Sequence, residues 1–108
     1  GLSVVAVSLK KKDSRAAIER MDSYPNPFNP TTTIRFALGE AASVDLRIYD
    51  AVGRVVRTIA SGERLGAGEH ERSWNGRDDS GRVVGGGVYF ARLRTGEASE
   101  TVRLVLLK

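Results

Sequence analysis

Cysteine is absent from this chain of 108 residues, and histidine occurs only once, as His70. Without cysteine the chain has no disulfides, no thiol nucleophiles and no zinc sites of the thiolate type. A serine nucleophile needs a nearby base, and here the single imidazole, between Glu69 and Glu71, would have to supply it without any nucleophile-elbow pattern. These absences predict a protein that is not an enzyme and has no catalytic residues.

Long apolar runs are absent as well. No stretch approaches the roughly 20 apolar residues that a membrane-spanning helix needs. Residues 1–8 are apolar, but they are too few for a signal peptide and no basic residues precede them. If the protein is exported, we therefore expect its signal to lie upstream or to have been removed.

A strong excess of one charge is also missing. The net charge of +4 divides evenly, because residues 1–23 hold five basic and three acidic groups and residues 24–108 hold twelve and ten. Nucleic-acid binders concentrate Arg and Lys on one face and interleave aromatic residues for stacking. Here the arginines stand at alternate strand positions beside acidic residues. We expect a solvated charged surface and no nucleic-acid partner.

Metal and cofactor motifs fail on spacing. The turn over residues 75–81 is rich in oxygen ligands, but placing Gly81 at the sixth position of an EF-hand loop makes Gly76 the first residue and Gly87 the twelfth. Both carboxylates that the loop requires are then missing. The clustered glycines elsewhere are not followed by the helix that would hold a phosphate. We expect no cofactor and no metal site of known pattern, and a looser surface calcium site stays open.

Alternation with a period of two dominates the second part of the chain. Apolar residues alternate with polar or small ones over residues 34–38 and again over 44–48, as in half-buried strands. Further apolar stretches follow at residues 55–60, 70–74, 88–93 and 101–107. Two turns, residues 50–53 and 78–81, have Asp first and Gly fourth, which is typical of tight turns. The pattern predicts an all-β, antiparallel sandwich.

Residues 1–23 look different and are predicted to be a leader strand and linker. Residues 2–9 read as a short strand, either an extra edge of the domain or the last strand of an upstream module. Residues 10–23 are polar, begin with three lysines and carry a weak helical pattern over residues 15–21 that is too short to stand alone. We expect an exposed linker here, with the folded domain at residues 24–108.

All three prolines lie close together, at positions 25, 27 and 30. Each proline fixes its own φ and pushes the preceding residue toward an extended conformation. The run Tyr24–Thr33 is therefore predicted to be a stiff, extended segment that marks the start of the domain.

This run resembles the opening of the type A C-terminal sorting domain of the type IX secretion system, a relative of the immunoglobulin-like domain of the flagellar hook-assembly protein. Further similar stretches follow in the same order and at the same spacing, at residues 48–57, 68–70, 74–81, 87–90 and 103–108. The resemblance covers residues 24–108. Two small departures are Asn75, where the family commonly has aspartate, and Gly86, where it commonly has serine.

The resemblance implies an immunoglobulin-like sandwich of about seven strands that acts as a non-catalytic secretion signal and cell-surface attachment domain. Implied partners are the outer-membrane secretion translocon, its shuttle protein, a processing protease and an upstream passenger domain. The protein would then be secreted or displayed at the cell surface by way of the periplasm and outer membrane. A sorting domain is expected to end its polypeptide, and we expect Lys108 to be that end.

Two alternatives remain for the function. One is a structural immunoglobulin-like module of the hook-assembly type. The other is an adhesive or carbohydrate-binding module of a surface enzyme. Against the second, the chain has only three Phe, three Tyr and one Trp, and alternation places most of them in the core, so that few are left for a stacking platform.

The candidate partner-binding residues lie on the terminal strand, where Val102, Leu104 and Leu106 alternate with Arg103, Val105 and Leu107. One set must face away from the core, unless the other sheet and residues 2–9 cover both, and exposed apolar residues on an edge strand suit a partner. The predicted partner-binding residues are Arg103, Leu104, Val105, Leu106, Leu107 and Lys108.

A second set of residues is predicted to be structural. Trp74 is expected to fill the core between the sheets, with Tyr89 and Leu93 facing inward and Val88 and Phe90 facing outward. The structural motif as a whole comprises Tyr24, Pro25, Asn26, Pro27, Phe28, Asn29, Pro30, Trp74, Gly76, Asp78, Gly81, Gly87 and Tyr89.

Overall fold

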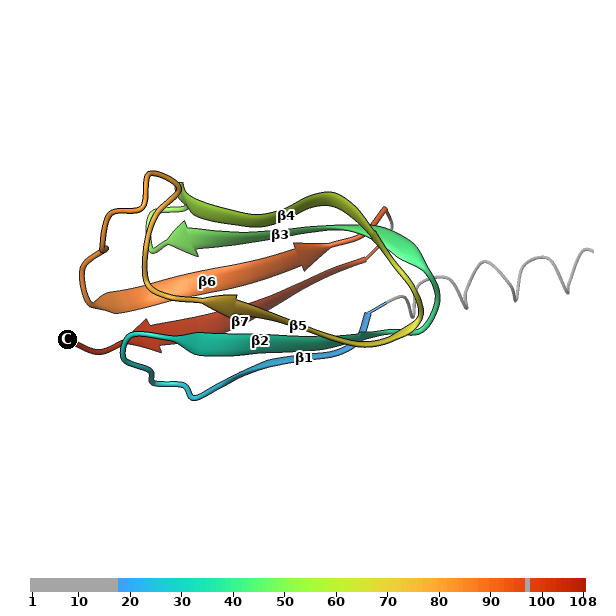
Figure 1. Ribbon diagram of the computed structural model, residues 1–108, viewed down its shortest axis with the longest axis horizontal. Helices are drawn as coiled ribbons and strands as arrows, with labels where there is room; N and C mark the ends of the chain where they lie inside the picture. Colours follow the sequence, from blue (N-terminus) through green and yellow to red (C-terminus); the bar gives the residue numbers. More distant parts are fainter. Residues whose placement is uncertain (1–17, 97) are drawn as a thin grey trace, which may run out of the picture.

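Two facing sheets make up the part of the chain that the computed structural model describes, residues 18–96 and 98–108 (Figure 1). The first sheet has the order β1 (Ile18–Tyr24), β2 (Thr32–Leu38) and β5 (Gly68–Trp74). The second has the order β4 (Val55–Leu65), β3 (Ala42–Asp50), β6 (Gly87–Arg94) and β7 (Ser99–Leu106). All neighbouring strands are antiparallel. The prediction of an antiparallel β-sandwich of about seven strands is confirmed.

The six stretches predicted as strands after the proline run all form strands, with small shifts at their ends. The largest shift is in β4, which continues to Leu65 rather than ending near Ala60. Gly62, with a φ of 62°, provides a bulge here, and its N–H donates to Asp45 Oδ1 at 2.8 Å. A glycine tolerates this left-handed conformation, so the pairing with β3 shifts register and resumes instead of stopping.

The inward faces of the two sheets share one apolar core. Trp74 is 1% exposed and Tyr89 and Leu93 are buried, as predicted, whereas Val88 is exposed and Phe90 half-buried on the opposite face of β6. The buried cluster comprises Phe28, Ile34, Phe36, Leu38, Val44, Leu46, Ile48, Ala60, Trp74, Tyr89, Ala91, Leu93, Leu104 and Leu106.

Strand β1 corrects the expectation for the end of the leader. Residues 18–23 were predicted to be linker, with a weak helical pattern as far as residue 21, but they belong to β1 and pair with β2. A register shift between Ile18 and Arg20 lets Ile18 and Met21, three residues apart, both pack against the core. Because of this bulge, the apolar residues of β1 do not alternate with a period of two in the sequence. The pairing with β2 outweighs the weak helix propensity of the same residues. The strand predicted at residues 2–9 lies outside the described residues. In the part that is described, no helix has the length and apolar character needed to cross a bilayer.

Candidate interaction surface around the last strand

Strand β7 lies at one edge of the four-stranded sheet, with β6 beside it. Its other side is occupied by the proline segment, residues 25–30, through a parallel bridge between Phe28 and Leu106. The Phe28 N–H donates to Val105 O at 2.9 Å, and the Leu107 N–H donates to Phe28 O at 2.8 Å. The carboxy-terminal end of the strand is therefore hydrogen-bonded on both sides.

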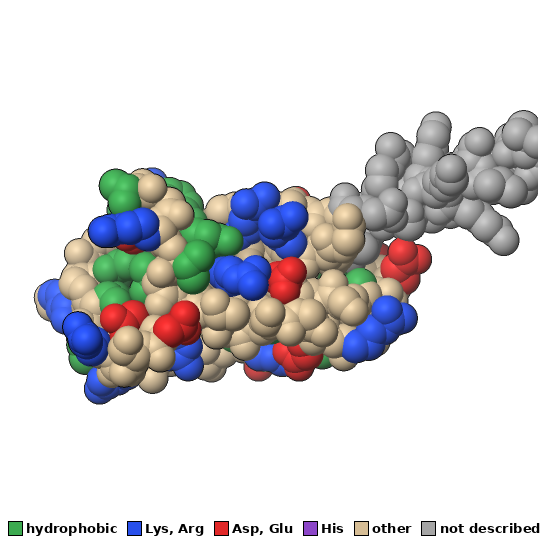
Figure 2. Space-filling model, turned by 90° about the horizontal axis from the view of Figure 1, so that it is seen from above, with side chains coloured by type: hydrophobic (Ala, Val, Ile, Leu, Met, Phe, Trp, Pro, Cys, Tyr) green, Lys and Arg blue, Asp and Glu red, His purple; other side chains and the backbone are tan. Residues whose placement is uncertain are grey.

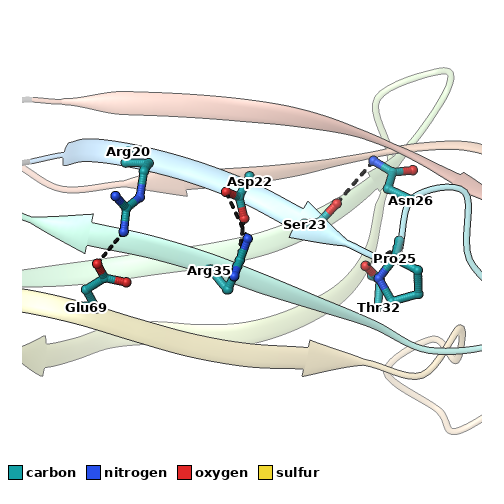
Figure 3. A network of polar contacts seen from close by, with 8 residues as sticks. All are labelled: Arg20, Asp22, Ser23, Pro25, Asn26, Thr32, Arg35 and Glu69. Carbon is teal, nitrogen blue, oxygen red and sulfur yellow. Dashed lines mark hydrogen bonds and ion pairs between the residues drawn. The ribbon is translucent and has the colours of Figure 1, made fainter.

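Asn26 extends this cover with its side chain. Its Nδ2 donates to Arg103 O at 2.7 Å, and the Val105 N–H donates to its Oδ1 at 3.0 Å. Nδ2 also lies 3.1 Å from Ser23 Oγ (Figure 3). Because a side-chain amide carries the same donor and acceptor as a peptide group, Asn26 substitutes for a residue of a neighbouring strand. The proline segment thus protects the edge of β7 from pairing with another chain.

The three prolines explain why this cover stays short. Pro25, Pro27 and Pro30 have no N–H, so a further strand could not pair regularly along the outer side of the segment. The carbonyl group of Pro25 has a partner inside the domain, because the hydroxyl of buried Thr32 donates to Pro25 O at 2.7 Å (Figure 3). The segment therefore covers β7 and does not itself form an edge to which another strand could pair.

Phe28 anchors the proline segment in the core through a row of aromatic rings. Its ring centroid lies 5.7 Å from that of Trp74, and Trp74 lies 5.3 Å from Tyr89 in an edge-to-face arrangement. The polar atoms of the row have partners, since Trp74 Nε1–H donates to Arg77 O at 2.9 Å and the Tyr89 hydroxyl donates to Gly85 O at 2.6 Å. These two bonds tie the row to the loop between β5 and β6.

That loop approaches the end of β7 at its glycines. A Cβ on Gly86 would lie 2.8 Å from Lys108 Cγ and 3.2 Å from Leu106 O, so a larger residue there would require the Lys108 side chain to shift. Gly76 is buried with a φ of 74°, and a Cβ there would lie 3.2 Å from Pro30 O. Small residues at these positions let the loop pack directly on the chain end.

Both Asp-x-x-Gly turns fold as predicted. Asp50 Oδ1 accepts the N–H groups of residues 52 and 54 at 3.0 and 2.9 Å, and Asp78 Oδ1 accepts those of residues 80 and 82 at 2.9 and 3.0 Å. Gly53 and Gly81 have φ values of 89° and 85°. Within the described ranges, no three acidic, His or Cys side chains gather in a group that could hold a metal. Whether the acidic turn binds calcium stays a prediction.

Asp50 makes the first turn sensitive to acid. The backbone hydrogen bond from Arg54 lowers the pKa of Asp50, and the Arg54 side chain and the Val52 N–H act in the same direction against partial desolvation. Since the pKa is lower in the folded state, this contribution to stability is present above the unfolded pKa of about 4 and is lost as pH falls through the folded value. We expect the stability gap between the wild type and Asp50→Asn to be constant above about pH 5 and to shrink as the pH falls below about 4 in urea unfolding. A constant gap would contradict this.

The structure sorts the six predicted partner-binding residues into two groups. Leu104 and Leu106 are 0% and 4% exposed and belong to the core, so a partner cannot reach them in the folded domain. This corrects their assignment, because alternation turns every second side chain of the strand inward. Arg103, Leu107 and Lys108 are exposed and Val105 is half-buried. These four residues form what we call the terminal surface, and Leu107, 50% exposed, is its most accessible apolar side chain.

A second apolar surface was missed by the sequence analysis. Val52, Val55 and Val83 are 75%, 51% and 57% exposed. Val55 also lines a shallow hollow of about 360 Å³ together with Val56, Val84 and five polar residues of the two Asp-x-x-Gly turns and their flanks. Figure 2 shows apolar side chains gathered at this end of the molecule, away from the residues drawn in grey. For Val52 the signal was present in the sequence, because a valine inside a tight turn has no core side to face.

Comparisons with known proteins agree with this architecture. The sequence profile of the FlgD Ig-like domain family matches residues 25–99. Among solved structures, the chain is similar to dimeric latent PorU from Porphyromonas gingivalis, with a TM-score of 0.63 and 20% identity over 81% of this chain and 9% of that chain. It is also similar to FLGD from P. aeruginosa, with a TM-score of 0.55 and 30% identity over 69% of this chain and 57% of that chain. No curated protein matches.

Proposed function

Because the chain belongs to the FlgD Ig-like domain family, we propose that it serves as a binding module, and specifically as a carboxy-terminal sorting domain of the type IX secretion system. In this role it is non-catalytic and directs an upstream passenger through the outer-membrane translocon, with the help of a shuttle protein, to the cell surface or the medium. A processing protease then removes the domain, or the domain holds the passenger at the surface.

The observation that carries this proposal is the fixed presentation of residues 103–108. The proline segment bonds β7 between Arg103 and Leu107, and the loop at Gly86 packs against Lys108. Leu107 is held with half of its side chain exposed. A rigid label of this kind loses little conformational entropy on binding, which suits repeated recognition by a shuttle or translocon.

The lack of a catalytic role is supported by the position of the single imidazole. His70 Nε2 lies 2.8 Å from Gly66 O, and its ring packs 5.6 Å from the ring of Phe36. Through these contacts the His70 side chain holds the loop before β5 in place.

A structural module of the hook-assembly type is the second candidate. It is favoured by the 30% identity to FLGD and by a family match that ends at residue 99. The two functions differ in what they ask of residues 103–108, since the proposed sorting role depends on a segment beyond the matched range.

Export of a reporter tests the proposal. The whole chain is placed behind a fluorescent protein with an amino-terminal signal peptide and expressed in a bacterium with a type IX system. We expect the reporter in the medium or on the surface, and we expect Leu107→Asp to reduce its export about tenfold, because a buried charge in the contact would be unpaired. Val52→Asp is the matched control, since Val52 is a more exposed apolar residue, in the turn after β3, and is expected to leave export unchanged.

Circular dichroism of each purified variant shows that the substitution has not unfolded the domain. A reporter that stays in the periplasm, or that is exported equally well from a strain lacking the translocon, contradicts the sorting function and favours the hook-assembly type.

A further inference from the structure

The outer faces of the two sheets differ in how their charges are paired. On the three-stranded sheet, Arg20 bonds Glu69, and Arg35 Nε donates to Asp22 Oδ1 at 3.0 Å (Figure 3). The hydrogen bond with Asp22 raises the pKa of Arg35 above its ordinary value. Glu71 lies opposite Arg35 as a third carboxylate on this face. Both arginines of the face are therefore paired with carboxylates of the same face.

The outer face of the four-stranded sheet is instead strongly cationic. Strand register places five arginines on it and one carboxylate, Asp45, for a net charge of +4 among the described residues. Asp45 accepts the Gly62 N–H at 2.8 Å, lies 4.0 Å from Arg47 Nη1 and stands opposite Arg94 in the strand register, so one carboxylate serves two of the arginines. We call these residues the arginine face: Arg47, Arg64, Arg92, Arg94 and Arg103.

The arrangement of these arginines is costly for the isolated domain. Arg47 and Arg92 lie directly opposite each other on β3 and β6, and like charges at such positions repel. Arg64, Arg94 and Arg103 are exposed and form no ion pair within the described part of the chain. The alternating arginines that suggested an ordinary solvated surface thus converge on one face, where a bound anion would relieve the repulsion.

Two aromatic rings lie at the end of this face. Tyr49 and Phe90 are directly opposite each other on β3 and β6, and both are half-buried. Together with Arg92, Thr101 and residues of the turn after β3, they line a shallow hollow of about 360 Å³. Asp50 is one of these turn residues, and its carboxylate is already bonded to Arg54. The hollow has the space for a small ring system, with an aromatic floor and a guanidinium at its rim.

We propose that the arginine face binds an acidic oligosaccharide, with a sugar ring on Tyr49 and Phe90 and its carboxylate or sulfate groups on Arg92, Arg47 and Arg103. An aromatic floor suits the apolar face of a sugar ring, and guanidinium groups pair with oxyanions in a bidentate manner. Single-stranded nucleic acid is disfavoured, because it needs successive stacking platforms and this face has one ring pair. The choice of a glycan rests on the proposed function, which brings the domain to the cell surface.

Calorimetric titration with hexagalacturonate, neutral maltohexaose and the oligonucleotide dT6 tests this site. We expect the wild type to bind hexagalacturonate alone and to lose affinity as salt rises, because the contact is with exposed charges. The double variant Arg47→Gln/Arg92→Gln is expected to weaken binding more than about tenfold and to melt no lower than the wild type, since it removes a repulsion. Tyr49→Ser keeps the charges and is expected to weaken binding about fivefold through lost stacking.

Arg35→Gln is the matched control, because it removes an arginine from the opposite face and is expected to change the affinity less than about twofold. Absence of saturable binding at millimolar hexagalacturonate, an equal loss with Arg35→Gln, or tighter binding of dT6 would each overturn the glycan site. Normal export of a reporter by a domain that fails these titrations would remove this inference alone. Glycan binding without export would remove the sorting function instead.

Discussion

Replacing Trp74 by alanine is expected to lower the free energy of unfolding by about 3 to 5 kcal/mol. The indole is 1% exposed and lies between Phe28 and Tyr89, so its removal leaves a cavity at the point where the proline segment meets both sheets. It also takes away the donor for Arg77 O. Domains of this size are stable by only about 5 to 15 kcal/mol, so the variant should be partly unfolded at moderate urea concentrations.

Urea unfolding followed by circular dichroism measures this effect. Tyr24→Ala is the matched control, because Tyr24 is an aromatic residue that is 72% exposed, and its loss should cost no more than about 0.5 kcal/mol. If the two variants unfold at the same urea concentration, Trp74 does not fill the core in solution.

The strands after the proline run could be predicted because their alternation survives in the sequence. In β3, Val44, Leu46 and Ile48 are buried, and the residues between them are not. Strand β1 could not be predicted in this way, because the register shift after Ile18 puts two inward residues three positions apart. A spacing of three is also the spacing of a helix face, and only the partner strand decides between the two.

The candidate surfaces were less predictable, because they depend on contacts between distant residues. Asn26 was assigned to a stiff extended segment, but its bonds to Arg103 and Val105 join residues 77 and 79 positions apart in the sequence. The arginines of β3 and β6 were each correctly expected to face away from the core. Their opposition follows from the strand order β4-β3-β6-β7, in which β3 pairs with β6, a strand that is not its neighbour in the sequence. Local patterns contain no information on that order.

Replacing Phe28 by alanine is expected to have the second large effect, a loss of about 3 to 5 kcal/mol. The ring is 2% exposed, and without it the proline segment has no anchor in the core. The segment should then leave the edge of β7, so that the amides of Val105 and Leu107 lose the acceptors that Asn26 and Phe28 provide. Exchange of these two amides should accelerate more than that of the amides of β3, which lies inside the sheet.

Asn26→Ala distinguishes the contribution of the bonds that cover β7 from the contribution of the aromatic row in the core. This substitution removes the two side-chain bonds to β7 but leaves the aromatic row in place, so we expect a loss of only about 1 to 3 kcal/mol, with faster exchange at Val105 and unchanged protection at Leu107. Phe28→Ala should in addition self-associate in a concentration-dependent way, because an uncovered terminal strand pairs with other chains. If Phe28→Ala remains monomeric with both amides protected, the edge of β7 is held by something other than the proline segment.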